Sequence, residues 1–584
     1  MNDDPSRVTR RQVLIGAGAV TATFGTVVLS SSKAAAADTW DREADIVVVG
    51  SGAGASSAAI VAHDNGDRVL MLEKAPIPGG TSARSAGVLW IPDNFTLRAK
   101  GIRDEKGDCL RYMARFSYPE RYAADQPMLG LSPRAYALLE AFYDNASAAI
   151  DKLRESGALN VAEWRMFALD RPATDYLDHV PENKVPAGRP LGPLKDDGQM
   201  GLGGDLMAQL GAAVQKREIP LLLRHRAMRL VVDPSGRVIG VEAETGGKAV
   251  RVRARKAVLF ATGGYAHDAE LVETHQRNRL YGSCAAPWAT GDFIHIAGAA
   301  GARMGNLTGA WRTQVVLEEA LHSSKMGAGV FYPPGDSMIQ VNRHGKRVVN
   351  ENRNYNDRTE AHGFFDPAAA EFPNQLLFMI YDRRTAEAFA GAYPLPADSA
   401  SAANVLRGDR LEDLAASLAR RLQEIAPRTG GFSLSSAFAA NLKATIARFN
   451  EFARNGKDLD FERGTAAYDR EWHRVFSPMK ADTSWPANDG PNPTIHPFAG
   501  DGPYFAIILA AGALDTNGGP QTDARAHVLD TKDRPIPGLY GAGNCIASPS
   551  RFAYWGAGHT LAMSITFGYI AANAAHREAP AGAA

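Results

Sequence analysis

Cysteine is scarce in this chain of 584 residues, and neither sign of charge is in excess. The three cysteines, Cys109, Cys284 and Cys545, are an odd number. Their spacing matches no zinc or iron–sulfur pattern, so we expect free thiols and no metal site. Lys and Arg together number 64, as do Asp and Glu, which makes the formal net charge zero. This balance argues against a nucleic-acid-binding surface and against a polybasic membrane patch.

Long apolar runs are also lacking, apart from one weakly apolar run near the N-terminus. Arg10 and Arg11 precede the weakly apolar residues 13–29, and the small residues 35–37 offer a cleavage site. Twin arginines before such a run are typical of a Tat signal, which exports proteins already folded. We therefore expect residues 1–37 to be a signal peptide and the mature protein to be periplasmic or exported, with no membrane span. The alternative is an uncleaved N-terminus that holds the protein at a membrane.

The remaining composition is that of an ordinary globular protein, with 45% hydrophobic and 22% charged residues. The length exceeds what one compact core usually holds, so two domains are expected. Residues 44–49 are apolar and β-branched, and a glycine-rich turn and an Ala-rich stretch lead to a second apolar run at 68–72. This order predicts a β-α-β unit. Further along, residues 342–345 predict a hairpin turn between strands at 338–341 and 346–349.

The turn of the β-α-β unit, Gly50-Ser51-Gly52-Ala53-Gly54-Ala55, matches a dinucleotide-binding pattern. Its glycines permit a tight turn and a close approach of the backbone to a pyrophosphate. The helix N-terminus that follows offers free N–H groups and a positive dipole to the phosphates. Glu73, directly after the second strand, is placed to bind ribose hydroxyls. Because the strand, the helix and the acidic residue all agree, the pattern is specific here.

Three further glycine clusters follow, at residues 79–82, 261–264 and 541–544. Each cluster alone could be an ordinary turn. Four clusters in this order predict one nucleotide site that is built from both ends of the chain. We therefore expect an α/β protein, α+β overall, with a discontinuous Rossmann-type domain and a second domain inserted into it.

The order of these clusters resembles the flavoprotein family of fumarate reductases and 3-ketosteroid dehydrogenases, over nearly all of the chain after the signal. Residues 79–94, 447–464 and 516–530 are most similar to the ketosteroid (Δ1-dehydrogenase) branch. The resemblance implies FAD as the cofactor. It implies a non-covalent FAD, because residues 79–94 lack the histidine to which covalently linked members attach it. The expected limits are residues 41–312 and 489–578 for the FAD-binding domain and residues 313–488 for the catalytic domain.

The chemistry of this family has three physical requirements. Desaturating a ketone beside its carbonyl needs a base for the α-proton, donors for the carbonyl oxygen and an acceptor for the β-hydride, which FAD supplies. In the resembled enzymes a tyrosine hydroxyl and a glycine N–H hold the oxygen, and these fall on Tyr554 and Gly558. The base of the resembled enzymes is a tyrosine in the segment after an Asn-Glu pair, and it falls on Tyr355. A supporting tyrosine of those enzymes falls on Tyr176. A tyrosine titrates near 10, so a base of this kind needs help that the sequence does not show.

The resemblance also implies which residues contact FAD. They are Gly50, Gly52, Ala53, Gly54, Ala55, Glu73, Lys74, Gly80, Thr81, Ser82, Ala86, Gly87, Ala227, Ala261, Thr262, Gly263, Asp292, Gly543, Asn544, Gly558, Thr560 and Leu561.

Two other functions stay open. A C=C reductase of the fumarate or urocanate reductase type would bind a dicarboxylate, for which Arg353 and Arg358 are candidates. Fumarate reductases usually carry a histidine before T-x-G-G, where this chain has Asp515, and the departure favours the ketone dehydrogenase. An exported electron carrier without a substrate site is the third hypothesis, which the lack of a C-x-x-C-H haem motif weakens. For the dehydrogenase we expect a small hydrophobic cyclic ketone, steroid-like or cyclohexanone-like, and an external electron acceptor such as a quinone.

Overall fold

The computed structural model describes residues 39–165, 171–476 and 483–581. The predicted signal peptide, residues 1–37, lies outside the described residues. Within them, no helix combines the length and the apolar character that crossing a membrane requires. From Trp40 onward the chain is organised around two large β-sheets.

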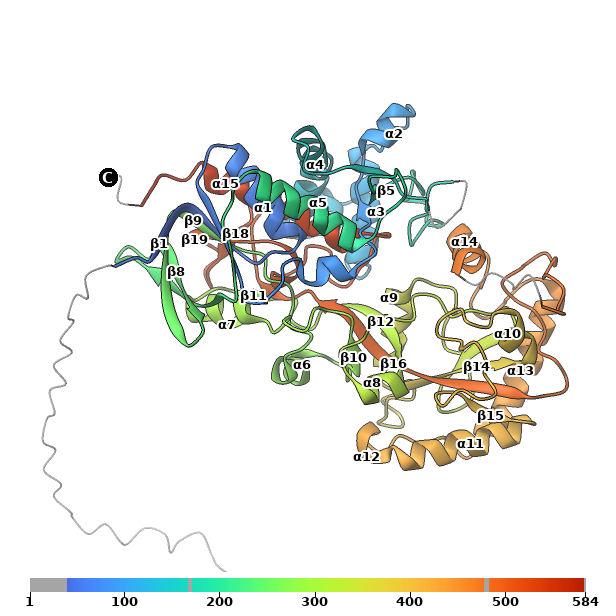
Figure 1. Cartoon of the computed structure of the whole chain (residues 1–584). Coiled ribbons are helices and arrows are strands. Elements are labelled where there is room, and N and C mark those ends of the chain that lie inside the picture. The colour runs from blue at the N-terminus through green and yellow to red at the C-terminus, as the bar shows by residue number, and fades with distance from the viewer. Residues whose placement is uncertain (1–38, 166–170, 477–482, 582–584) are drawn as a thin grey trace, which may run out of the picture. The chain divides into compact units, whose positions relative to one another are not determined.

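The first sheet has a parallel centre that both ends of the chain build (Figure 1). Strand β1 (Arg42–Val49) lies between β2 (Val69–Glu73) and β9 (Lys248–Phe260) and is parallel to both. Strands β6 (Leu221–Leu223) and β19 (Pro535–Gly541) extend the parallel part on the two sides. This arrangement confirms the predicted α/β class with a discontinuous Rossmann-type sheet. The antiparallel strands are β7 (Arg226–Val232), β8 (Val238–Thr245) and β18 (His527–Leu529).

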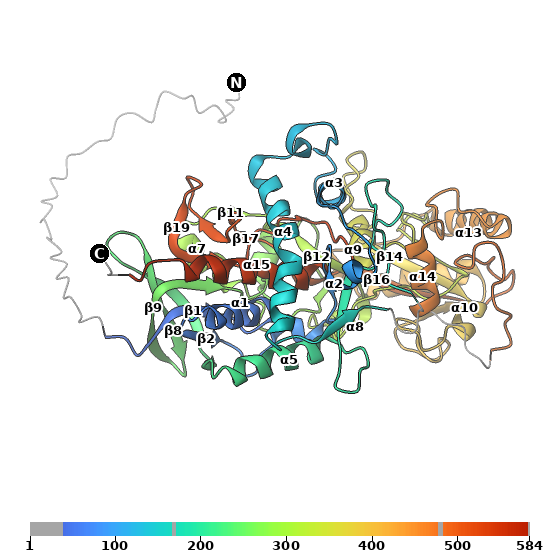
Figure 2. The ribbon, with the colours of Figure 1, turned by 90° about the horizontal axis from the view of Figure 1, so that it is seen from above.

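Helix α1 (Ala53–Asp64) begins just after β1 and lies beside α15 (His559–His576), as Figure 2 shows. Small residues let the two helices approach closely, since a Cβ on Gly54 would lie 2.8 Å from the backbone oxygen of Ser564. The Ser57 hydroxyl donates to the backbone oxygen of Ile565 across this contact. The last helix of the chain therefore supports the first helix of the nucleotide fold.

Other helices and a small sheet pack around this first part. Helix α5 (Gly203–Lys216) contacts α1, and α4 (Pro133–Glu155) contacts both α15 and α3 (Lys106–Ser117). The remaining elements here are α2 (Phe95–Ala99), α6 (Ala269–His275), α7 (Asp292–Ala299), β3 (Leu89–Trp90), β4 (Val161–Glu163), β5 (Pro190–Pro193), β11 (Met304–Gly305) and β17 (Gly519–Pro520).

The second sheet is built around the long strand β16 (Tyr504–Thr516), drawn in orange in Figure 1. It pairs antiparallel with β12 (Ala310–Val316), β14 (Leu376–Asp382) and β15 (Leu406–Gly408). Strand β13 (Met338–Val341) pairs with β14. A short strand, β10 (Gly282–Ser283), pairs parallel with β16 on the edge opposite to β12.

Alternating apolar side chains bury both faces of this sheet. On one face, Phe378 and Ile508 share a core with α11 (Leu411–Glu424) and α13 (Phe438–Asn455). The other face packs on residues of α10 (Arg383–Ala388) and the segment after it. The remaining helices of this part are α8 (Leu317–His322), α9 (Tyr355–Glu360), α12 (Ala426–Thr429) and α14 (Ala467–Phe476).

The hairpin predicted around residues 342–345 is wrong in its second half. Strand β13 forms, but residues 346–349 contribute only an isolated bridge between Val341 and Arg347. The physical reason is that the Arg347 side chain turns inward to buried carboxylates, so the segment does not continue beside β13. The predicted domain limits stay a prediction, although β16 of the second sheet lies within residues 489–578.

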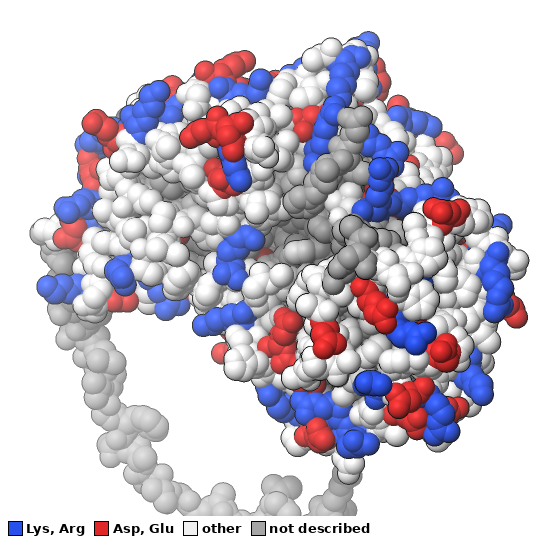
Figure 3. All heavy atoms as spheres, turned by 45° about the vertical axis from the view of Figure 1, so that its right-hand side comes forward, with Lys and Arg blue, Asp and Glu red and all other residues white. Residues whose placement is uncertain are grey.

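Positive and negative side chains are intermingled on the face shown in Figure 3, without a large area of one sign. This distribution agrees with the zero net charge of the chain. Charge on this face gives no reason to expect an electrostatic docking surface.

Candidate active site

A groove opens at the carboxyl ends of the parallel strands, where open α/β sheets bind their ligands. Its floor is the turn 50–54, and its walls come from the segments 80–82, 261–263 and 542–544. We call this the nucleotide groove. The four glycine clusters therefore converge in space, although the first begins at Gly50 and the last at Gly541.

The start of α1 fits a pyrophosphate. Gly52 caps this helix without any side-chain hydrogen bond, and the first turn holds no acidic residue. A Cβ on Gly52 would meet only the Ser82 hydroxyl, at 3.2 Å, and the Gly79 backbone oxygen, at 3.8 Å. Within the protein, only the Ser82 hydroxyl crowds this position, so a phosphate in the groove would add most of the demand for glycine there. Free N–H groups and the helix dipole would both attract phosphate.

The acidic residue at the end of β2 is held in place by its neighbours. The Ser51 hydroxyl donates to Glu73 Oε2 at 2.6 Å, and the Ala75 backbone N–H donates to Glu73 Oε1 at 2.8 Å. Beside it, Lys74 Nζ lies 3.0 Å from an oxygen of Asp292. Glu73, Lys74 and Asp292 line a small hollow that adjoins the groove, together with Ala227. Glu73 thus faces the side on which a ribose would lie.

The structure brings the expected FAD contacts together, with one exception. Ala55 is fully buried inside α1 and lines none of the hollows. All the other expected contacts line the nucleotide groove, its adjoining hollow or the cavity described next. Sequence reasoning did not assign further lining residues to the site. Ser51 and Ala542 lie within the glycine motifs, and the others carry no local motif: Ala75, His225, Ala286, Trp288, Ala289, Asp515 and Ser564.

An apolar cavity of about 340 Å³ adjoins the nucleotide groove. Thr81, Ser82 and Asn544 line both hollows, so a ligand in the groove reaches the cavity. Much of the remaining lining of the cavity is an aromatic wall. It consists of Trp164, Tyr176, Trp311, Phe331, Tyr355, Trp472 and Tyr554.

The three predicted catalytic tyrosines meet in this cavity: Tyr176, Tyr355 and Tyr554. We call them the tyrosine cluster. The Tyr176 hydroxyl donates to the Tyr355 hydroxyl at 2.9 Å. The Tyr554 ring stacks on Tyr176 at 5.3 Å and lies 5.6 Å from Tyr355, centroid to centroid. Burial raises the pKa of Tyr355 and of Tyr176 well above the usual tyrosine value. The cluster therefore needs a source of positive potential before one of its members can act as a base.

Gly558 lies on the groove side of the cavity, directly before α15. Its φ is +88°, and a Cβ there would lie 2.3 Å from the backbone carbon of Val88. Both facts restrict the position to glycine. Gly558 and Tyr554 both line the cavity, where the N–H of one and the hydroxyl of the other could bind a carbonyl oxygen.

A buried ion triad supports the cluster from behind. Arg189 binds Asp104 through two hydrogen bonds of 2.7 Å each and also pairs with Asp175, which precedes Tyr176. Asp175 accepts a hydrogen bond of 2.8 Å from the Trp90 indole. The Tyr176 backbone N–H donates to the Trp555 backbone oxygen at 3.2 Å. This scaffold fixes two of the three tyrosines, and sequence reasoning did not find it, because Asp104 and Arg189 carry no motif.

Comparisons with known proteins agree with this geometry. The model of the FAD binding domain family matches residues 45–561. The chain belongs to the FAD binding domain family. It is 32% identical to the 4-oxocyclohexanecarboxylate 2-dehydrogenase of Sinomonas cyclohexanicum, over 90% of this chain and 92% of that protein. It is 26% identical to a fumarate reductase (cytochrome) of Shewanella frigidimarina, over 93% of this chain and 78% of that protein.

Among solved structures, the chain is similar to the 3-ketosteroid Δ1-dehydrogenase of Sterolibacterium denitrificans in complex with 1,4-androstadiene-3,17-dione. The TM-score is 0.74 at 27% identity, over 92% of this chain and 99% of that one. These comparisons confirm two predictions from the sequence: the cofactor is FAD, and the protein is an FAD-dependent oxidoreductase.

The relatives of this chain include both a ketone dehydrogenase and a fumarate reductase, and two residues bear on the choice between these functions here. Arg358 does not line the cavity; its guanidinium is 1% exposed and bound to Gln314 and to backbone oxygens. It is therefore not free to bind a substrate carboxylate. Asp515 does line the cavity, and its carboxylate accepts from the Gly264 N–H at 3.0 Å and from the Asn544 amide at 3.2 Å. A carboxylate at this place repels a dicarboxylate substrate, so the geometry favours the ketone.

Proposed function

We propose that the chain is an FAD-dependent dehydrogenase that introduces a C=C bond next to the carbonyl of a cyclic ketone. The observation that carries this proposal is the hydrogen-bonded pair Tyr176–Tyr355, which faces Tyr554 and Gly558 in an apolar cavity adjoining the nucleotide groove. A base, an oxygen-binding pair and a cofactor site are what the reaction requires.

Each residue of the site has one task in this reaction. Tyr355 takes the α-proton on its ionised oxygen, and the Tyr176 hydroxyl, which donates to that oxygen at 2.9 Å, stabilises its charge before the step. The Tyr554 hydroxyl and the Gly558 N–H hold the carbonyl oxygen as it gains negative charge. Bound FAD supplies the acceptor for the β-hydride. The aromatic wall excludes water and holds a flat, apolar ring.

The finer features of the function are part of the same proposal. The substrate is a small hydrophobic cyclic ketone, either a steroid or a cyclohexanone, and an external acceptor such as a quinone reoxidises the flavin. The FAD is held without a covalent bond, because no histidine lies within residues 79–94. Acid precipitation should then release all the flavin, and flavin left on the pellet would contradict this part.

The decisive experiment is anaerobic bleaching of the flavin. We expect cyclic 3-ketosteroids or 4-oxocyclohexanecarboxylate to reduce the bound flavin, and we expect fumarate not to reoxidise flavin that has been reduced chemically. Tyr355→Phe and Tyr554→Phe should each lower the reduction rate by about a hundred-fold or more, because each removes a base or an oxyanion donor. FAD content should stay normal.

Tyr381→Phe is the matched control. Tyr381 is as deeply buried, but it lies in β14 and donates to Ser399 at 3.0 Å, away from the cavity. Its variant should reduce flavin at the wild-type rate. If the Tyr355 and Tyr554 variants also kept that rate while fumarate reoxidised the flavin, the reductase would be the better assignment.

Localisation is a separate proposal: residues 1–37 act as a Tat signal and send the folded protein to the periplasm or beyond. Arg10 and Arg11 motivate it. A reporter fused after residue 40 should be exported only when both arginines are intact. Export that survives Arg10→Lys with Arg11→Lys would overturn the Tat assignment.

A further inference from the structure

The cavity that holds the tyrosine cluster has a buried end and an exposed end. At the buried end, Tyr176, Tyr355 and Tyr554 are 1%, 6% and 4% exposed. Other residues of the lining are exposed to solvent, and we call four of them the mouth: Arg84, Leu202, Gly327 and Ala328. The proposed function places the ketone at the tyrosine cluster. The opposite end of a bound substrate therefore points toward the mouth.

One segment of the chain, residues 326–331, connects the mouth to the tyrosine cluster. At its beginning, the Met326 backbone oxygen accepts a hydrogen bond of 2.8 Å from the Arg84 guanidinium. At its end, the Phe331 ring packs edge-on against the Tyr355 ring at 5.2 Å, centroid to centroid. Residues between these two also line the cavity. Arg84 and the proposed base thus lie at the two ends of one side of the cavity.

Arg84 brings a positive charge to this lining. Among the described residues that line the cavity, it is the only one with a cationic side chain. Its Nε donates to the Cys284 backbone oxygen at 3.0 Å, and its Nη2 donates to the Met326 backbone oxygen at 2.8 Å. These bonds hold the guanidinium at the mouth without neutralising it. Its Nη1 forms no hydrogen bond with the described part of the chain, so donors remain for a ligand.

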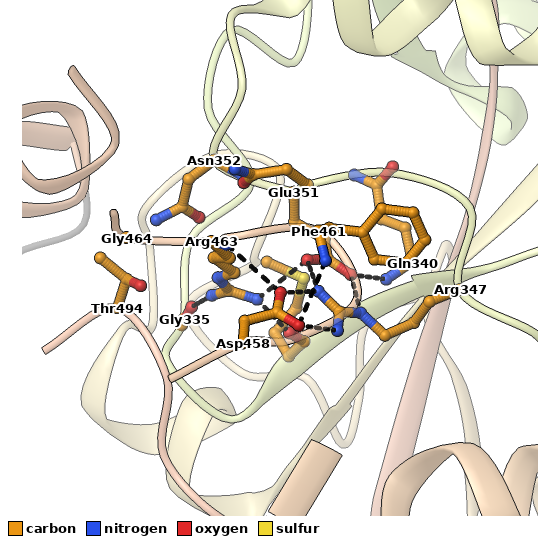
Figure 4. Close-up of polar contacts among 12 residues, drawn as sticks. Gly335, Gln340, Arg347, Glu351, Asn352, Asp458, Phe461, Arg463, Gly464 and Thr494 are labelled. Carbon is orange, nitrogen blue, oxygen red and sulfur yellow. Dashed lines mark hydrogen bonds and ion pairs between the residues drawn. The ribbon is translucent and has the colours of Figure 1, made fainter. Parts of the chain in front are cut away.

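Several other arginines of this protein are occupied by carboxylates, as Figure 4 shows for one buried cluster. Arg347 Nη2 lies 2.8 Å from Glu351 Oε2 and 2.8 Å from Asp458 Oδ2. Arg463 Nη1 lies 3.4 Å from the same oxygen of Glu351. Arg84 forms no ion pair of this kind with any residue that the structure describes. Its charge is therefore available to an anion that enters the cavity.

The charged groups close to Arg84 make the mouth more positive. Lys325 is exposed and directly precedes Met326. Burial lowers the pKa of His267, and the positive charges of Lys325 and Arg84 lower it further, so this histidine is neutral at neutral pH. An anionic group at the mouth would thus meet two cations.

The negative charge of the lining lies at the other end. Asp515, the only carboxylate among the described residues that line the cavity, is 1% exposed. It also lines the nucleotide groove, which places it at the inner border of the cavity. Negative charge inside and positive charge at the mouth favour one orientation of a molecule with a neutral ketone at one end and an anion at the other. The ketone then points inward and the anion outward.

We propose that Arg84 is a specificity-determining residue that binds a carboxylate of the substrate, at the end opposite to the reacting ketone. The inference rests on the proposed function and narrows its substrate class to cyclic keto acids. The acid is either a cyclohexanone carboxylate or a 3-oxosteroid whose side chain ends in a carboxylate. Arginine suits this task, because its planar fork matches the two oxygens of a carboxylate. The aromatic wall recognises the ring, and Arg84 recognises the charge.

The test compares each acid with its own methyl ester, which has nearly the same shape but no charge. The two acids are 4-oxocyclohexanecarboxylate and 3-oxochol-4-en-24-oate, and each reduces the flavin of the holoenzyme under anaerobic conditions. For one of them we expect half-saturation at a concentration about tenfold lower, or more, than for its ester, because the hydrogen bond joins two charged groups. The pair with this preference identifies the ring system. Equal half-saturation by acid and ester in both pairs would overturn the proposal.

Three variants show whether Arg84 causes the preference. Arg84→Gln should bring the acid-to-ester ratio to about one, whereas Arg84→Lys keeps the charge and should retain part of the preference. Lys325→Gln is the matched control. It removes an exposed charge of the same sign beside Met326, but Lys325 does not line the cavity, so the ratio should stay near that of wild type. A purely structural role for Arg84 predicts that acid and ester weaken equally in Arg84→Gln, and that result would overturn the proposal.

A binding measurement separates the carboxylate site from the reaction. 4-Hydroxybenzoate and its methyl ester carry a flat ring that is already unsaturated, and their binding to the oxidised holoenzyme is followed by the flavin spectrum. We expect the acid to bind more tightly than the ester in wild type, and both to bind alike in Arg84→Gln. If this pattern holds while no ketone reduces the flavin, the proposed function is wrong and the carboxylate site stands.

The opposite result has the opposite meaning. If ketones reduce the flavin while every acid binds like its ester, the proposed function stands and the inference on Arg84 is wrong. If Arg84→Gln does not fold, the wild-type comparison decides. The preference for the acid should then shrink as salt is added, because the mouth is exposed and its charges are screened. A preference that salt does not change would contradict a charge at the mouth as its cause.

Discussion

The nucleotide groove and the cavity of the tyrosine cluster adjoin each other, yet they are built in different ways. The groove is lined largely by backbone and small side chains, with Gly52 and Ala53 at the start of α1. The cavity is lined by large aromatic side chains from distant segments, with Tyr176, Tyr355 and Tyr554 at its centre. A groove of this kind recognises phosphates through main-chain N–H groups. The cavity depends instead on side chains that buried charges hold in place.

This difference predicts which kind of substitution damages each region. In the groove, an added side chain competes with the ligand for space. Behind the cavity, the loss of one side chain leaves charged partners unpaired in the interior. The predictions below test this contrast, starting from the largest expected effect.

The strongest test of the groove compares two glycines two residues apart. Gly52→Val should abolish FAD binding while the protein stays folded, because its Cβ would meet only Ser82 and Gly79 in the protein and its methyl groups would fill the pyrophosphate space. Gly54→Val should instead destabilise the fold, because its Cβ would meet the α15 backbone at 2.8 Å. Flavin absorbance and thermal unfolding distinguish the two losses. Full FAD content in Gly52→Val would contradict the statement that the space above Gly52 holds the pyrophosphate.

The scaffold behind the cavity should respond to the loss of one cation. Arg189→Met leaves Asp104 and Asp175 unpaired in the interior, so we expect a loss of about 3–5 kcal/mol in unfolding free energy. Arg68→Met is the control, since Arg68 is 57% exposed and pairs with Asp45 at the surface, where about 1 kcal/mol or less is expected. Denaturant midpoints measure both. Equal effects would mean that the triad does not support the site.

The smallest effect is expected at the border of the two regions, where Asp515 lines both. Burial raises the pKa of Asp515 from 3.8 to about 6. The folded state therefore binds this proton more tightly than the unfolded state, and stability falls as pH rises from about 4 to 6, then stays level. Asp515→Asn removes this loss. Relative to wild type, the variant should gain about 3 kcal/mol between pH 4 and pH 7; a difference independent of pH would show that the carboxylate does not titrate there.

Much of this could be predicted from the sequence. The β-α-β unit around Gly50 and Glu73 rests on local rules of periodicity, turn chemistry and helix ends, which act within a few residues of one another. The catalytic residues Tyr355 and Tyr554 were assigned by resemblance to a family, and the structure brings them together at 5.6 Å. Their roles stay predictions until the variants are measured.

Other features had no local signal. The second strand predicted at 346–349 does not form, because Arg347 pairs with buried carboxylates, which periodicity cannot reveal. Arg358 was a candidate for a substrate carboxylate in the reductase alternative, yet it lies behind the cavity wall and binds backbone oxygens. Nothing in the sequence marks Asp104 and Arg189 as partners, since 85 positions separate them.

The sequence by itself determined the cofactor class and the parallel core of the first sheet, because glycine spacing and strand periodicity are short-range properties of the chain. Tertiary structure alone decided which tyrosines share a hydrogen bond, which carboxylates pair with Arg189, and that Arg358 has no carboxylate partner among the described residues. The physical reason is that burial sets the energy of a charge or a hydroxyl, and burial depends on segments that meet only when the chain has folded.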